Sequence, residues 1–513
     1  MHFGGCPGNG NPETETPGNP GDIIFSGQKM HLEAAQNFIN GNWTPALAGQ
    51  TMPVYEPATG EAYAAIADST AQDVDLAVRA ARKAFDEGDW GKTTAMDRGR
   101  MLARLSALIT KHAAELAAIE SRDTGKPKSA GAADIAALAR YFEFYGGGAD
   151  KMHGEVVPYL AGYFVSVLRE PHGVTGHILP WNYPAQMFGR TLAPALAAGN
   201  AVVLKPAEDA CLSSLRIAEL AREAGFPDGA INIVTGKGTV AGAALAAHPG
   251  IDFLSFTGSP AVGQAVQKLA ADHFIACTLE LGGKSPQVVF ADADLDAAIP
   301  VLRKAIIQNT GQTCSAGSRV LVERSVYDTL MERLRASFAD VRVGAPEMDL
   351  DCGPIINEKQ KQRVLGFANN AQQEGATLMA EGAIDPRVAP GGYYVKPMLF
   401  GAVPRNASLA REEVFGPVLS VLTFSDEADA IALANATDYG LVAAVWTKDG
   451  GRQIRVAKKI RAGQVFINCF GAGAGIELPF GGVGKSGHGR EKGFAALHEF
   501  TRTKTVVMNH GTS

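Results

Sequence analysis

Apolar residues recur at helical spacing in two stretches of the first third of the chain, residues 71–85 and 98–120. In the second stretch, Leu102, Leu105 and Ile109 fall on one face, which is typical of a helix that packs against a core. We therefore predict a helix over each of the two stretches.

From residue 174 onward the pattern changes to short apolar runs that alternate with helical stretches. The runs predict strands, and the stretches between them predict helices. The strands are expected at residues 174–179, 201–205, 231–234, 253–256 and 277–281, and the helices at 213–224, 240–247 and 261–271. Because a helix between successive strands makes a right-handed crossover, this order predicts an α/β protein with a parallel, doubly wound sheet.

Ligands bind such sheets beyond the carboxyl ends of the strands, so the residues after each strand are the first candidates for a site. Polar, Gly or Pro residues follow four strands, at residues 180–184 (PWNYP), 205–208 (KPAE), 257–259 (TGS) and 280–284 (ELGGK). Gly258 and Ser259, with Gly263 one turn later, open a helix whose free N–H groups suit a pyrophosphate. The spacing is not the usual G-x-G-x-x-G, and glycine-led helix starts are common.

The other side chains at these strand ends have structural interpretations as well as functional ones. Lys205 suits a phosphate or a ribose, but also an ordinary solvated surface. Asn182, between two prolines, is typical of a turn. Glu280 suits a helix cap or an ion pair as well as catalysis. Taken singly, these residues leave both interpretations open.

Cys314 lies in a Gly- and Ser-rich segment, residues 309–319, which follows a helical stretch at residues 302–307. A cysteine that only packs in a core is not usually found in such a segment. The segment can leave backbone N–H groups free to face an oxyanion, so Cys314 is the candidate nucleophile. For the other five cysteines the simpler interpretation is a small buried apolar side chain.

Length, charge and cysteine usage narrow the function classes. The 513 residues are too many for one core, so two or three structural units are expected. A net charge of -6 gives no reason to expect a nucleic-acid partner, and no apolar run is long enough for a membrane span. The six cysteines lack metal-ligand spacing, so we expect free thiols in a cytoplasmic protein without a metal. Residues 1–30, rich in Gly, Pro and Asn, are expected to form a disordered extension.

Five blocks of sequence together resemble the aldehyde dehydrogenase superfamily, in its NAD(P)-dependent, non-acylating form. The blocks are residues 180–184 (PWNYP), 280–286 (ELGGKSP), 311–314 (GQTC), 412–418 (EEVFGPV) and 479–482 (PFGG). They occur in the order of the family, and the resemblance runs from about Leu32 to Met508. Each block is fairly specific, and the combination leaves little room for chance.

The resemblance implies a Rossmann-like cofactor domain, an α/β catalytic domain and a small β oligomerisation element. The NAD-binding domain is expected over residues 31–150 and 171–282, the catalytic domain over 283–484, and the oligomerisation element with the C-terminal tail over 151–170 and 485–513. Residues 163–169 and 503–508 alternate like strands. In relatives such strands extend a sheet across a subunit interface, so a homodimer or homotetramer is expected.

The resemblance also implies roles for individual residues. Cys314 would attack the aldehyde, the Asn182 amide and the Cys314 N–H would hold the oxyanion, and Glu280 would activate the water that releases the acid. The cofactor would be NAD, with NADP as the alternative. The residues implied to bind it are Trp181, Lys205, Glu208, Thr257, Gly258, Ser259, Gly263, Leu281, Glu413 and Phe415.

One departure from the family pattern concerns the removal of the proton from the general base. Many relatives have a lysine at the position of Thr191, where it relays the proton toward a glutamate that matches Glu491. The lysine is absent here, which puts that relay in doubt.

A second departure concerns the substrate tunnel. Many relatives have an aromatic residue at the position of Arg190. On the helix expected over residues 185–196, Gln186 and Arg190 share a face, which would line the tunnel together with Phe470. The guanidinium of Arg190 either receives a polar group at the far end of the aldehyde or pairs with an internal carboxylate.

Two other function classes share these motifs. A CoA-acylating relative would pass the acyl group to CoA instead of water, but that branch commonly lacks the general-base glutamate that Glu280 matches. A non-enzymatic protein on the same scaffold would not need Cys314, Asn182, Glu280 and Glu413 together. An NAD(P)-dependent enzyme that oxidises an aldehyde to a carboxylic acid is therefore the expectation.

Overall fold

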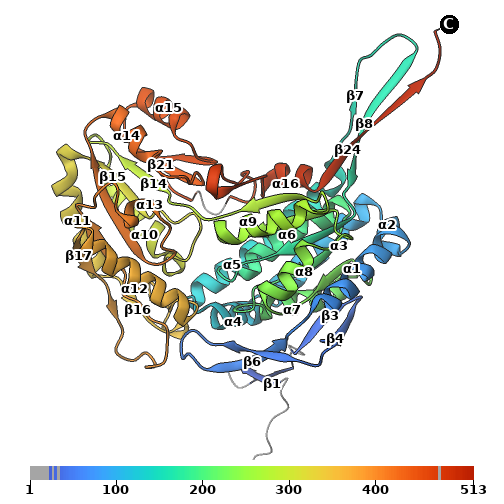
Figure 1. Cartoon of the computed structure of the whole chain (residues 1–513), viewed down its shortest axis with the longest axis horizontal. Coiled ribbons are helices and arrows are strands. Elements are labelled where there is room, and N and C mark those ends of the chain that lie inside the picture. Colours follow the sequence, from blue (N-terminus) through green and yellow to red (C-terminus); the bar gives the residue numbers. More distant parts are fainter. Residues whose placement is uncertain (1–21, 26–27, 32–34, 472–474, 513) are drawn as a thin grey trace, which may run out of the picture.

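Two α/β bodies, each built on its own sheet, make up most of the molecule, and a narrow β-ribbon projects from one of them (Figure 1). The computed structural model describes residues 22–25, 28–31, 35–471 and 475–512. The two bodies meet along a cleft-shaped cavity, which is described below.

The first sheet has eight strands in the order β23-β13-β12-β9-β10-β11-β3-β4. The bounds are β3 (Gln36–Ile39), β4 (Asn42–Pro45), β9 (Val174–Ile178), β10 (Ala201–Lys205), β11 (Ile231–Ile233), β12 (Phe253–Thr257), β13 (Ala276–Glu280) and β23 (Gly487–His488). Strands β9 to β13 pair in parallel, which confirms the predicted doubly wound sheet, and the remaining strands add antiparallel edges. Strands β9, β10 and β12 are buried along their whole length, as central parallel strands are.

Two rows of helices contact this sheet. One row contains α1 (Ala71–Asp86), α8 (Ala243–Ala246) and α9 (Pro260–Ala271); the other contains α6 (Pro184–Ala198) and α7 (Leu212–Glu223), backed by α3 (Ala95–Lys111), α4 (Ala113–Thr124) and α5 (Lys128–Gly148). The short α2 (Asp89–Lys92) follows α1, and α16 (Gly493–Glu499) packs on α6. Helix α6 begins with Pro184 in its first turn and ends at Gly199, whose φ of 98° is the left-handed conformation that glycine favours.

The second sheet has seven strands in the order β17-β19-β20-β15-β14-β21-β22, and only the pair β17–β19 is antiparallel. Its strands are β14 (Pro286–Val289), β15 (Arg319–Glu323), β17 (Thr377–Glu381), β19 (Met398–Gly401), β20 (Val418–Phe424), β21 (Val442–Trp446) and β22 (Gln464–Ile467). The helices of this body are α10 (Leu295–Ile307), α11 (Tyr327–Ala339), α12 (Glu358–Gln373), α13 (Ser408–Arg411), α14 (Glu427–Ala434) and α15 (Gly450–Lys459). Cys314 lies between α10 and β15, next to the first body.

The projecting ribbon is a third sheet, in the order β24-β8-β7 (Figure 1). It consists of β7 (Glu155–Val156), β8 (Tyr163–Pro171) and β24 (Thr501–Asn509), all antiparallel. Large apolar side chains on it are exposed, among them Phe164, Leu168, Val507 and Met508. Three further strand pairs are β1–β2 (Asp22–Phe25, Gln28–His31), β5–β6 (Thr51–Tyr55, Ala62–Ala67) and β16–β18 (Arg342–Val343, Ala383–Ile384).

Two predicted helices differ from the structure in their bounds. The single helix expected over residues 98–120 is two helices, α3 and α4, which meet at His112. The apolar spacing continues on both sides of His112, so the pattern alone does not reveal the break. The helix expected over residues 240–247 is a π-type turn over Gly238–Gly242 followed by the four-residue helix α8.

The structure adds detail near both ends of the chain. Within the extension expected to be disordered over residues 1–30, β1 and β2 pair as an antiparallel hairpin, while residues 1–21 lie outside the described residues. Within residues 485–513, expected to hold part of the oligomerisation element and the C-terminal tail, β23 extends the first sheet, α16 packs into its core, and β24 joins the ribbon. A strand as short as Gly487–His488 has too few residues to show alternation.

Candidate active site

A cavity of about 1880 Å³ lies between the two bodies. The sequence-predicted site residues all line it, except Lys205 and Gly263. The first body contributes the segments that follow β9, β12 and β13, and the second contributes the segments around Cys314 and Glu413. The carboxyl ends of parallel strands thus converge on one site, as expected for a doubly wound sheet.

A tight left-handed turn fixes the segment before Cys314. Asn309, Thr310 and Gly311 have φ values of 49°, 55° and 72°, and two of these residues are not glycine. A Cβ atom on Gly311 would lie 2.1 Å from the carbonyl oxygen of Gly416, so only glycine fits there. Strained conformations of this kind persist where the surroundings enforce them, which is common at functional sites.

The Asn182 side chain points toward the same turn. Its Nδ2 donates to the carbonyl of Gln312 at 2.9 Å, and a carboxamide nitrogen has a second hydrogen that remains for an oxyanion. The Asn182 carbonyl accepts hydrogen bonds from Lys126 Nζ (3.0 Å) and from Asn309 Nδ2 (2.9 Å). Lys126, which is buried, was not recognised from the sequence. Its only signal in the sequence was the triplet Gly125-Lys126-Pro127. Helix α4 ends at this triplet, with Gly125 in the left-handed conformation.

Glu280 ends β13 and is 2% exposed. Neither carboxylate oxygen has a hydrogen-bond partner among the described residues. Burial raises the pKa of Glu280 and the nearby Glu491 raises it further, while Arg190 lowers it; the result is a pKa well above the usual range.

The Cys314 thiol is partly exposed to the cavity. Burial raises its pKa to about 11, although the positive charge of Arg190 acts in the opposite direction. The thiol is therefore protonated at neutral pH until a base removes its proton. A glycine at 283 is required beside it, because a Cβ atom there would lie 2.6 Å from the Cys314 carbonyl oxygen.

Arg190 lines the cavity, but its guanidinium faces internal carboxylates. Its guanidinium forms ion pairs with Glu491 and, at 3.7 Å, with Glu280, and it stacks on Phe480 at 4.3 Å from the ring centroid. Of the two alternatives left open by the sequence, the structure supports internal pairing. The neighbouring Thr191 donates its hydroxyl to the Met187 carbonyl of its own helix at 3.1 Å.

The other two predicted substrate residues do line the cavity. Gln186 Nε2 donates to Asp134 at 2.6 Å, and Asp134 also pairs with Lys126. Phe470 packs against Phe466, with 5.7 Å between ring centroids. The wall near the nucleophile is thus more polar than the sequence predicts, since Asp134 and Lys126 were not among the expected residues.

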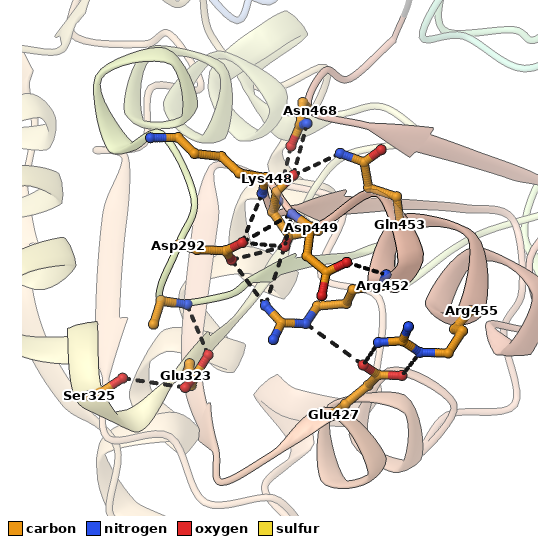
Figure 2. Close-up of polar contacts among 12 residues, drawn as sticks. Asp292, Glu323, Ser325, Glu427, Lys448, Asp449, Arg452, Gln453, Arg455 and Asn468 are labelled. Atoms are coloured by element: carbon orange, nitrogen blue, oxygen red, sulfur yellow. Dashed lines mark hydrogen bonds and ion pairs between the residues drawn. The ribbon is translucent and has the colours of Figure 1, made fainter.

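The start of the segment that carries Phe470 is held by a network around Asp292 (Figure 2). The Asp292 carboxylate accepts hydrogen bonds from the Thr447 hydroxyl at 2.9 Å and from the backbone N–H groups of Lys448 and Asp449. Thr447 in turn exchanges two hydrogen bonds of 3.0 Å with the side chain of Asn468. The carboxyl ends of β14, β21 and β22 are therefore tied together two residues before Phe470.

The far part of the cavity has the features that a dinucleotide requires. Helix α9 begins there, and its N-cap Ser259 accepts a hydrogen bond from the Val262 N–H. The Thr257 hydroxyl is buried and has no hydrogen-bond partner among the described residues, and a Cβ atom on Gly258 would lie 2.6 Å from the Phe256 ring. A helix N-terminus with an unsatisfied hydroxyl beside it suits a pyrophosphate.

Glu413 marks the other end of the dinucleotide path. It accepts a hydrogen bond from the Gly283 N–H at 2.9 Å, and a Cβ atom on Gly282 would lie 2.1 Å from its carboxylate. Burial raises the pKa of Glu413 to about 7, although the Gly283 N–H and the charge of Lys284 lower it. Phe415 lies edge-on to Trp181, with 5.3 Å between ring centroids. The residues present therefore fit NAD.

Lys205 and Glu208 form a tight pair near the start of this path. Lys205 Nζ lies 2.7 Å from the Glu208 carboxylate, which also accepts a hydrogen bond from the Gly238 N–H. Burial raises the pKa of Glu208, but Lys205 and the Gly238 N–H lower it more, so the carboxylate is ionised. Lys205 is itself buried behind the cavity wall, and Gly263 packs against Leu281.

Comparison with known proteins gives this site its family. The model of the aldehyde dehydrogenase family matches residues 43–506. A mitochondrial aldehyde dehydrogenase of Arabidopsis thaliana, family 2 member B4, is 43% identical over 93% of this chain and 89% of its own. The chain therefore belongs to the aldehyde dehydrogenase family.

Two solved structures are similar over nearly the whole chain. A candidate aldehyde dehydrogenase of Burkholderia cenocepacia has 62% identity and a TM-score of 0.92, covering 93% of this chain and all of that one. The structure of PnpE in complex with nicotinamide adenine dinucleotide has 40% identity and a TM-score of 0.91, covering 94% of this chain and 98% of that one. The chain is an NAD-dependent enzyme that oxidises an aldehyde to a carboxylic acid.

In the part of the chain that is described, no helix is long and apolar enough to cross a membrane. No group of three or more His, Cys, Asp or Glu side chains among these residues is arranged to hold a metal ion.

Proposed function

We propose that Cys314 is the nucleophile of this oxidation and that the reaction passes through a thioester on its sulfur. The observation that carries the proposal is the meeting of three groups in one cavity: the Cys314 thiol, the Asn182 amide and the Glu280 carboxylate. A thiolate is the form that attacks an aldehyde, so the thiol first gives up its proton to water in the cavity, which leaves the Glu280 carboxylate free to act in the later step.

The Asn182 amide and the backbone N–H of Cys314 stabilise the oxyanion that forms when sulfur adds to the aldehyde carbon. Lys126 and Asn309 hold the Asn182 backbone carbonyl, so the amide is positioned before the substrate arrives. NAD, when bound, accepts the hydride that leaves this carbon. The carbonyl double bond then re-forms, and the acyl group remains on Cys314 as a thioester.

Glu280 then removes a proton from water as the water oxygen attacks the thioester carbon. The C–S bond breaks, its electron pair stays on the Cys314 sulfur as a thiolate, and the acid is released. The presence of Glu280 in the wall favours water over CoA as the acyl acceptor. The test is to supply the protein with NAD and a small aldehyde, without CoA, and to measure NADH and free acid. Equal amounts of both are expected. NADH formation that requires CoA, or none at all, would contradict the proposal.

A preference for NAD over NADP is expected from Glu208. An ionised carboxylate accepts hydrogen bonds from ribose hydroxyls but repels a 2′-phosphate, and Lys205 only partly offsets that repulsion. We expect kcat/KM to be roughly tenfold higher with NAD. Glu208→Gln should lower the ratio of kcat/KM with NAD to kcat/KM with NADP, mainly by raising kcat/KM with NADP. Glu223→Gln, which removes an exposed carboxylate on α7, is the control. A higher kcat/KM of the unaltered enzyme with NADP would contradict the role of Glu208.

We further propose that Gln186 and Phe470 line the substrate path and that the exposed ribbon β7-β8-β24 joins copies of the chain in a homodimer or homotetramer. The apolar side chains exposed on the ribbon support this use. Residues 31–150 and 171–282, with β23 and α16, are proposed as the NAD-binding domain, and residues 283–484 as the catalytic domain. The five described cysteines are free thiols, which supports a cytoplasmic location.

A further inference from the structure

Arg190 lies between two buried carboxylates. Glu280 is 2% exposed, Glu491 is 1% exposed, and Arg190 itself is 7% exposed. Arg190 Nη2 is 3.7 Å from Glu280 Oε2, and Arg190 Nε pairs with Glu491 Oε2. Two carboxylates this close together and away from water would favour sharing a proton if no cation lay between them.

The surroundings hold the guanidinium in this place. It stacks on the Phe480 ring, and Phe480 exchanges two backbone hydrogen bonds of 2.7 and 2.8 Å with Glu491. The second oxygen of Glu491 accepts a hydrogen bond from Ser255 on β12 at 3.3 Å. Arg190 therefore has a fixed partner, Glu491, on one side and contacts Glu280, which lines the cavity, on the other.

We infer that Arg190 is a positioning residue that favours the ionised form of the general base Glu280 and directs it at the cavity, and that it does not bind the substrate. The inference rests on the proposed role of Glu280. The charges of Glu491 and Glu280 raise the pKa of Arg190 more than burial lowers it. The guanidinium therefore stays charged through the cycle and does not take up the proton that Glu280 removes from water. That proton leaves Glu280 by way of cavity water.

Helix α6 supplies a single cation next to Glu280. The hydroxyl of Thr191 is engaged within α6, so the only cation of this helix that contacts Glu280 comes from Arg190, one residue earlier. A lysine amine can exchange a proton, whereas a guanidinium cannot do so in a protein. The cluster thus supplies a permanent charge instead of a proton relay.

Several other groups act on Glu280, and the experiment must separate them. They are Glu491, Arg490 and Lys492, from the segment before α16, and Cys314 across the cavity; Tyr141 on α5 acts on Arg190. Burial and the charge of Arg190 lower the pKa of Lys492 to about 7, so the charge of Lys492 also changes over the pH range in which acyl-enzyme decay is measured. Lys492 also lies beside Phe480, with its Nζ 5.3 Å from the ring centroid.

The test is the pH dependence of acyl-enzyme decay. The enzyme is mixed with NAD and a small aldehyde, quenched at intervals, and the acyl group on Cys314 is followed by intact mass. Removal of the cation in Arg190→Met should move the acidic limb of the decay rate upward by about 1–2 pH units. Removal of the competing carboxylate in Glu491→Gln should move it downward, because Glu280 loses a like charge and keeps Arg190. Arg190→Lys should restore part of the shift, and Lys492→Gln should move the limb less than Arg190→Met.

These opposite signs distinguish positioning from a purely structural role. NAD affinity and thermal unfolding identify a variant that fails to fold. If Arg190→Met fails to fold, the Glu491→Gln and Arg190→Lys variants still test whether Arg190 positions Glu280. Shifts of the same sign in the Arg190→Met and Glu491→Gln variants, or no shift in either, overturn the inference. So does a rise in KM of the Arg190 variants confined to aldehydes with a carboxylate group. If Glu280→Gln leaves acyl-enzyme decay unchanged, the proposed role of Glu280 fails instead.

Discussion

Replacement of Cys314 by alanine should abolish NADH formation with every aldehyde, while the affinity for NAD stays within about twofold of that of the unaltered enzyme. In the proposed mechanism the sulfur forms the covalent bond to the substrate, whereas the residues that fit the dinucleotide lie elsewhere along the cavity. A residual rate within tenfold of the original would contradict covalent catalysis by this residue. Steady-state NADH absorbance and NAD titration by protein fluorescence measure the two quantities.

Cys277 offers a matched control for this substitution. It is the other partly exposed cysteine of intermediate burial, and it lies on β13 away from the cavity wall. Cys277→Ala should retain activity, which separates the loss of one particular thiol from the general effect of removing a cysteine. Intact mass after quenching should show the acyl adduct in the Cys277 variant and not in the Cys314 variant.

Replacement of Glu280 by glutamine should slow steady-state turnover by about 10²–10⁴-fold, the usual contribution of a general base. Glutamine keeps the shape of the side chain but cannot accept the proton of water. If the thiol still loses its proton by another path, one equivalent of NADH should form quickly and the acyl adduct should accumulate on Cys314. If Glu280 also deprotonates Cys314, that first equivalent should form slowly as well.

The pH dependence of the unaltered enzyme supplies a second measurement for Glu280. Burial and Glu491 raise the pKa of this carboxyl, so at low pH it holds a proton and cannot act as a base. Acyl-enzyme decay should therefore rise as the pH rises through that raised pKa. The Glu280→Gln variant should lack this limb. Steady-state rates equal to those of the unaltered enzyme would remove Glu280 from the role.

The sequence predicted the first sheet well because parallel strands buried on both faces are short, continuous apolar runs. β9, β10 and β12 lie within one residue of their expected bounds for this reason. The break at His112 and the two-residue strand β23 were not predictable, because neither changes the periodicity that defines a helix or strand. They depend on contacts with segments that are distant in the sequence.

The same distinction applies to the site. The residues at strand ends could be placed together, since the ends of parallel strands meet at one edge. The direction of the Arg190 side chain could not be predicted. Its main partner, Glu491, lies about 300 residues further along the chain. The position of Arg190 on its helix was compatible both with a side chain that points along the substrate tunnel and with one that pairs with an internal carboxylate. Lys126 and Asp134 escaped notice because a buried ion pair leaves no periodic signal.

The two glycines beside Cys314 have a mechanical consequence. Gly311 touches the backbone of Gly416, and Gly283 touches the carbonyl of Cys314 while its N–H is held by Glu413. The loop that carries the nucleophile and the loop that carries Glu413 and Phe415 are therefore in direct backbone contact, with no side chain between them to absorb a displacement. A shift of one loop by a few tenths of an ångström must move the other. The position of the Cys314 sulfur and the positions of the Glu413 and Phe415 side chains are thus coupled through the backbone.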